Sequence, residues 1–65
     1  MLMVSVKLKG SSLAMNFNPV DRAELELRSD IAQAMQSKNP LVLHEATVTT
    51  FIPSELVEFV QIVIQ

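Results

Sequence analysis

Residues 56–65 read LVEFVQIVIQ, and this stretch constrains the fold more than any other part of the 65-residue chain. Seven of its ten residues are apolar and most of these are β-branched, so it predicts a final strand. Alternation along a strand places its apolar residues on two faces: Val57, Phe59 and Val63 on one, and Val60, Ile62 and Ile64 on the other. A strand that is apolar on both faces is normally covered on both sides.

The N-terminal third predicts a β-hairpin. Apolar residues alternate with Ser and Lys over residues 2–8, and alternation resumes over residues 13–17. Gly10-Ser11-Ser12 lies between them and includes the only glycine, which is free to take a positive φ.

Residues 19–38 predict one long helix. Asn18 can cap its start and Pro19 suits the first helical turn, while Lys38-Asn39-Pro40 marks its end. Glu24 and Arg28 have the spacing of an i,i+4 ion pair. The expected apolar face contains Val20, Ala23, Leu27, Ile31 and either Ala34 or Met35.

We expect this face to pack on the hairpin, with Leu27 and Ile31 against Val4, Val6 and Phe17. A rival interpretation takes residues 23–27 as a strand and lets Asp30 and Gln33 open a short separate helix. The many good helix formers in this region favour the single helix.

Residues 41–43 and 47–52 predict further strands, joined either by a tight hairpin or by a bulge in one long strand. The whole chain, residues 1–65, thus predicts a single α+β domain of ββαββ(β) order. It contains a β-hairpin, one α-helix and two or three further strands, in a single antiparallel or mixed sheet with the helix on one face. One helix covers only one face of one sheet, which leaves apolar surface on residues 56–65 without a cover.

Two segments carry a resemblance. Residues 33–47, QAMQSKNPLVLHEAT, and residues 52–62, IPSELVEFVQI, resemble the small uncharacterised ββαββ-type proteins of cyanobacteria and actinobacteria. In those proteins a Ser-x-Asn-Pro-like stop ends the helix, and a Val/Ile-Pro-x-x-x-Ile/Leu-x-x-Val-x-Ile strand closes the chain. This chain departs from them at residues 44–50, where they usually have a longer charged hairpin with a glycine. The resemblance implies a fold and no activity.

Composition excludes several classes of protein. With 49% hydrophobic and 18% charged residues the chain is not disordered, and without cysteine it is not a disulfide scaffold. The net charge of −2 is too low for a basic nucleic-acid-binding surface. The longest apolar run, residues 1–4, is far shorter than the ~20 residues of a membrane span, and Lys7 and Lys9 interrupt the only candidate signal peptide. We therefore expect a cytoplasmic protein.

Catalytic and metal-binding patterns are weak. His44 is the only histidine, and we expect it to be a partly exposed strand residue. A metal site that joins it to Glu45, Glu55 or Glu58 is the alternative, although zinc normally has three or four protein ligands. One glycine cannot form a phosphate loop, and there is no Gly-x-Ser-x-Gly elbow. We expect no enzyme, no catalytic residues, no cofactor and no metal.

Two polar surfaces remain as contact candidates. The first, on the hairpin, contains Lys7, Lys9, Asn16 and Asn18. Without a neighbouring aromatic platform it is expected to be solvated, and its alternative role is to contact nucleic acid. The second, on the helix, contains Asp21, Glu24, Glu26 and Asp30, and it is either solvated or docks a basic partner.

A chain of this size buries only about 60% of its unfolded surface and is marginally stable alone. We therefore expect a small non-enzymatic homo-oligomeric adaptor or regulator that also binds a larger protein, with a size typical of phage or plasmid accessory proteins. The alternative is an oligomeric nucleic-acid or small-ligand binder whose site lies between subunits. Phe59 is the expected interface anchor. The residues expected to divide between core and subunit interface are Val57, Phe59, Val60, Ile62 and Ile64.

Overall fold

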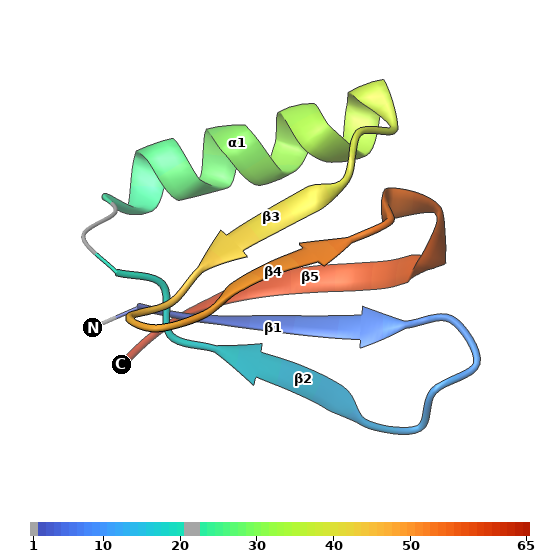
Figure 1. Cartoon of the computed structure of the whole chain (residues 1–65), viewed down its shortest axis with the longest axis horizontal. Helices are drawn as coiled ribbons and strands as arrows, with labels where there is room; N and C mark the ends of the chain where they lie inside the picture. The colour runs from blue at the N-terminus through green and yellow to red at the C-terminus, as the bar shows by residue number, and fades with distance from the viewer. Residues whose placement is uncertain (1, 21–22) are drawn as a thin grey trace.

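A computed structural model of the chain describes residues 2–20 and 23–65, in which five strands and one α-helix follow the predicted order (Figure 1). The α+β class is confirmed, and the helix is followed by three strands. The elements are β1 (Leu2–Leu8), β2 (Ala14–Phe17), α1 (Glu24–Ser37), β3 (Leu41–His44), β4 (Thr49–Ile52), the 3-10 helix η1 (Ser54–Leu56) and β5 (Val57–Ile64).

The predicted N-terminal hairpin is confirmed. β1 and β2 pair antiparallel, with Val4 opposite Phe17 and Val6 opposite Met15. Gly10 has φ 81°, a left-handed conformation that glycine adopts without strain. The second strand begins one residue later than expected, because Leu13 accepts a hydrogen bond from the Ser11 hydroxyl and remains in the turn, 76% exposed.

The expected single sheet is wrong. The strands form a three-stranded sheet of order β2-β1-β5 and a separate two-stranded sheet, β3-β4. Between β4 and β5 the chain makes a 3-10 turn in which the Leu56 N–H donates to the Pro53 carbonyl. This turn replaces a hairpin connection, and β5 pairs with β1 instead of β4.

The open question about residues 41–52 is settled in favour of a hairpin. β3 and β4 pair antiparallel from Leu41 opposite Ile52 to His44 opposite Thr49, and the Glu45 N–H donates to the Val48 carbonyl across the turn. In Figure 1 this hairpin lies in front of β5, and α1 runs alongside β3.

A β-bulge in the last strand places one of its residues on a different face of the sheet from the one predicted. Lys7 lies opposite Phe59 but Leu8 lies opposite Val57, so Glu58 is an extra residue in β5. The prediction that Val57 shares a face with Phe59 and Val63 is therefore wrong. Val57 is buried in the core, and Val60 and Ile62 pack against that core from the same side of the sheet.

The helix is continuous, so the rival strand-plus-short-helix interpretation is wrong. It also begins later than Asn18 and Pro19 predict, since Ala23 is the N-cap residue. Val20 precedes the helix, and its N–H donates to the His44 carbonyl at 3.2 Å. The predicted end is confirmed: Lys38 is left-handed at φ 58°, and the Asn39 N–H bonds the Ala34 carbonyl.

One apolar core joins the two sheets and the helix. Leu27 and Ile31 are buried together with Val4, Val6 and Phe17, as predicted. The same core takes in side chains from the second hairpin and the start of β5: Leu41, Leu43, Ile52 and Val57. Because α1 and the hairpin both bury their side chains with those of Val4 and Val6, they cover the same face of the three-stranded sheet. No described element packs on its other face.

Candidate interaction surfaces

The uncovered face of the three-stranded sheet is the first candidate surface, and we call it the outer sheet face. Strand register defines its members, which are Met3, Ser5 and Lys7 of β1, Ala14 and Asn16 of β2, and Phe59, Gln61 and Val63 of β5. Phe59 is 40% exposed although it is aromatic, whereas Ser5 is only 7% exposed. Ser5 lies on the central strand between Asn16 and Gln61, whose longer side chains flank it.

The charge of Lys7 on this face is paired. Its Nζ lies 2.6 Å from a carboxylate oxygen of Glu58, the bulge residue. Phe59 is directly opposite Lys7 in the register. The bulge therefore places an ion pair beside an exposed aromatic ring at one end of β5.

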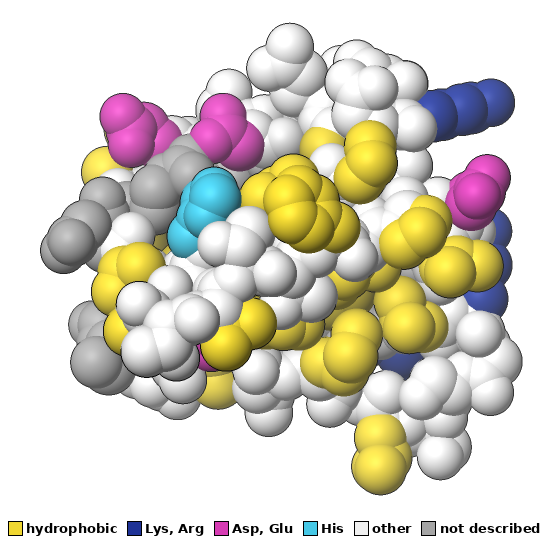
Figure 2. Space-filling model, viewed as in Figure 1, with side chains coloured by type: hydrophobic (Ala, Val, Ile, Leu, Met, Phe, Trp, Pro, Cys, Tyr) yellow, Lys and Arg dark blue, Asp and Glu magenta, His cyan; other side chains and the backbone are white. Residues whose placement is uncertain are grey.

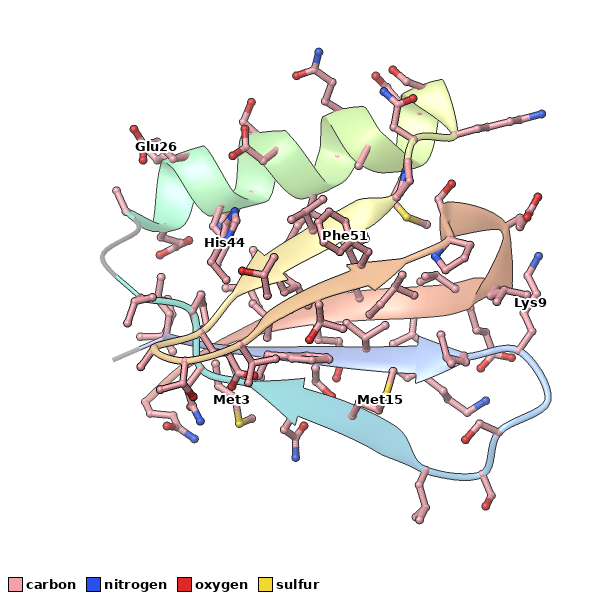
Figure 3. The ribbon with its side chains drawn as sticks, viewed as in Figure 1. Met3, Lys9, Met15, Glu26, His44 and Phe51 are labelled. Carbon is pink, nitrogen blue, oxygen red and sulfur yellow. The ribbon has the colours of Figure 1, made fainter. Side chains whose placement is uncertain are left out.

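The structure brings together only two of the four predicted polar contact residues. Lys7 and Asn16 share the outer sheet face. Lys9 lies beyond the end of β1, at the right of Figure 3, and Asn18 lies in the loop after β2. The Asn18 N–H donates to the Glu45 carboxylate at 3.0 Å, so this residue has a structural role in joining the two hairpins.

The five predicted interface residues are placed in different environments. Val57 is a core residue, 4% exposed, and Val60 and Ile62 pack partly buried against the core. Phe59 lies on the outer sheet face. Ile64 lies opposite Leu2 near the chain end and is 67% exposed.

A groove between α1 and β3 is the second candidate surface, and we call it the α1–β3 groove. Its volume is about 310 Å³, and its walls include Asp30, Gln33 and Ala34 from the helix with Pro40, Val42 and His44 from the strand side. Phe51 lies opposite Val42 on the hairpin beside this groove and is 67% exposed. Figure 3 shows its ring in front of the hairpin, and Figure 2 shows hydrophobic side chains gathered on this face of the molecule.

Sequence reasoning missed Phe51 and Val42. The signal was present, since Val42 separates two apolar residues and Phe51 precedes Ile52. In a hairpin with Leu41, Leu43 and Ile52 facing the core, both must face outward.

The residues weighed for catalysis or metal binding lie apart or have other partners. His44 is exposed at the end of β3, as predicted, and its Nδ1 is 3.1 Å from the Thr49 hydroxyl. Glu45 bonds the Asn18 N–H, and Glu58 pairs with Lys7. Within residues 2–20 and 23–65, no group of three His, Asp or Glu side chains is arranged to hold a metal ion.

The acidic helix surface is present in part. Glu24 pairs with Arg28, which confirms the predicted i,i+4 contact, and Glu26 and Asp30 lie on the exposed side of α1. Asp21, its fourth predicted member, is outside the described residues.

Comparison with known proteins gives no relative: no family model, no curated protein and no solved structure matches this chain. Among the helices in the described part, none has the length and apolar character needed to cross a membrane.

Proposed function

We propose that this protein is a small non-enzymatic binding protein that works as a homo-oligomer and docks on a larger protein as an adaptor or regulator. The observation that carries the proposal is the pair of exposed phenylalanines, Phe59 and Phe51, each on a sheet face that no described element covers. Exposed aromatic anchors of this kind supply much of the binding energy at protein interfaces.

The two surfaces are suited to different tasks. The outer sheet face ends at the edge of β5, so a second copy that pairs along that edge would extend it. The α1–β3 groove is an open depression with apolar and polar walls, and Phe51 stands beside it. A partner segment that inserts an apolar side chain into the groove would cover Phe51 and Val42 together.

Light scattering over a dilution series tests self-association. We expect a mass above the 7.2 kDa of one chain at tens of micromolar, with an unfolding midpoint that rises with protein concentration. A mass near 7.2 kDa together with a concentration-independent transition would contradict the homo-oligomer.

Affinity capture from the source cell tests partner binding, and Phe51→Ser is the informative variant. It should lose the specific partner while it keeps the parent's oligomeric mass. The matched control is Leu25→Ser, which changes an equally exposed apolar residue on α1 and should keep the partner. Equal capture by the parent and Phe51→Ser would remove this groove from the proposal.

The same affinity capture also tests the alternative, in which the protein binds nucleic acid. If captured nucleic acid is released steeply by salt and lost in a Lys7→Gln, Lys9→Gln double variant, the alternative is favoured. The Lys7–Glu58 ion pair supports the opposite expectation, because it neutralises one of the two charges.

A further inference from the structure

β5 has a free edge, and the contact that this edge offers to a second copy rests on the proposed homo-oligomer. In the strand order β2-β1-β5, the eight-residue β5 pairs with β1 on one side and with no other described strand on its other side. The peptide groups along an edge strand are unpaired, and they form a template for another strand.

Apart from the bulge at Glu58, β5 lacks the features that usually protect such an edge. Natural edges carry lysines, prolines or inward-pointing charges, or they are very short. The only charged residue of β5 is Glu58, at the bulge, where it is paired with Lys7. Residues 59–65 contain no charge, proline or glycine. The opposite edge, β2, has only four residues, so β5 is the longer and less protected of the two edges.

Symmetry limits how two copies of β5 can pair. A two-fold axis makes the strands antiparallel, and residues that face each other must point to the same side of the joined sheet. One residue must therefore face its own copy on the axis. The choice of that residue decides every other pair.

Gln61 is the best axial residue. The alternation of β5 is regular beyond the bulge at Glu58, and centring on Gln61 pairs residues 59–63 of that part with their copies. Phe59 then faces the partner subunit's Val63, and Val60 faces the partner subunit's Ile62. Moving the axis to Val60 would put Phe59 opposite the partner subunit's Gln61, and moving it to Ile62 would put Gln61 opposite the partner subunit's Val63. Within residues 59–63, only the Gln61 axis pairs every apolar residue with an apolar one.

We infer that two copies of the chain pair their β5 strands antiparallel about Gln61, and that the two three-stranded sheets join into one continuous sheet. Phe59 and Val63 then form a shared apolar patch across the joined outer sheet faces. Val60 and Ile62, half-buried in one chain, gain cross-strand partners on the inner face.

The absence of cysteine allows a clean cross-linking test on the full chain. Residues that face each other in an antiparallel pair have Cα atoms about 4.5–5.5 Å apart, which is within the range of a disulfide. Under mild oxidation Gln61→Cys should therefore shift from 7.2 kDa to twice that mass on a non-reducing gel. Gln61 is exposed, so its replacement should leave the reduced protein's melting transition unchanged.

Two single-cysteine controls fix the geometry. Glu58→Cys would lie six residue positions from its own copy, about 20 Å at ~3.4 Å per residue, and should stay at one chain's mass. Asn16→Cys is exposed on the outer sheet face and should cross-link only if the outer faces stack on each other. Cross-linking of Asn16→Cys or Glu58→Cys, with none at Gln61→Cys, overturns the β5 pairing.

Light scattering on Gln61→Lys gives a second, independent readout. Two lysines facing each other on the axis repel, so the mass should fall to that of one chain, while the control Asn16→Lys should keep the parent's mass. If the parent is oligomeric and Gln61→Lys stays oligomeric, the β5 pairing is wrong and the homo-oligomer stands. If the parent itself is monomeric, both the pairing and the homo-oligomer fail.

Discussion

The three-stranded sheet and the β3–β4 hairpin both bury one face in the same core, yet they are held in the molecule by different forces. β1 is paired on both edges along most of its length, whereas among the described strands β3 and β4 pair only with each other. Two described hydrogen bonds tie the hairpin to the chain after β2, from the Val20 N–H to the His44 carbonyl and from the Asn18 N–H to the Glu45 carboxylate.

Side-chain packing compensates for the hairpin's lack of strand pairing with the three-stranded sheet. Leu41 and Leu43 are each 1% exposed and are among the most completely buried large side chains in the described chain. The four-residue β3 therefore contributes two fully buried large side chains, as many as the seven-residue β1 does with Val4 and Val6. The hairpin therefore depends on its leucines, whereas the three-stranded sheet also depends on its backbone ladder.

Leu43→Ala should have the largest effect on stability, because it removes packing from the element that has little else to hold it. We expect a loss of about 2–5 kcal/mol in the free energy of unfolding, measured by urea denaturation. Val42→Ala, one residue away on the outer side, should cost less than roughly 1 kcal/mol. Equal losses from both variants would show that the hairpin's two faces are energetically alike.

Ile31→Ala tests how much the helix contributes to the stability of the core that the two sheets share. Ile31 is 8% exposed in the shared core, so we expect a loss of about 2 kcal/mol, near the lower limit for such truncations. Leu25 is 74% exposed on the same helix, and Leu25→Ala should melt like the parent. If Leu25→Ala proves the more destabilising in thermal melts, the helix packs by another face.

The smallest effect should come from the Lys7→Gln, Lys9→Gln double variant. It removes the Lys7–Glu58 ion pair from the outer sheet face, and exposed pairs of this kind contribute about 0.2–1 kcal/mol. The melting temperature and oligomeric mass should be almost unchanged. A large loss of stability would show that the bulge in β5 depends on this ion pair.

Local patterns in the sequence predict the elements well and their partners poorly. Alternation around Val4 and Val6 and the three- and four-residue spacing of Leu27 and Ile31 identify the core, since burial follows the period of each element. The division into two sheets depends on which strands pair, and period-2 alternation carries no information about that choice.

The errors have non-local causes. Asn18 and Pro19 look like a helix start, but Asn18 and Val20 bond residues 45 and 44, far along the chain, and these bonds accompany a later start at Glu24. The bulge at Glu58 is set by pairing with Lys7 and Leu8, so strict alternation placed Val57 on the wrong face. Of the two exposed phenylalanines, the sequence singled out Phe59 as an interface residue but not Phe51. The outward position of Phe51 follows only from the register of the β3–β4 hairpin.

The pairing of β1 with β5 also has a consequence for how the chain folds. Leu2 lies opposite Ile64, and Figure 1 shows the two ends of the described chain side by side. The contacts of this ladder span almost the whole sequence, and such non-local pairing closes a long loop before it gains any contact energy. During synthesis the first hairpin and the helix can form early, but the central strand keeps an unpaired edge until residues 57–64 emerge. We therefore expect folding to be slow for so short a chain, with the nascent chain most prone to aggregate just before its last strand is available.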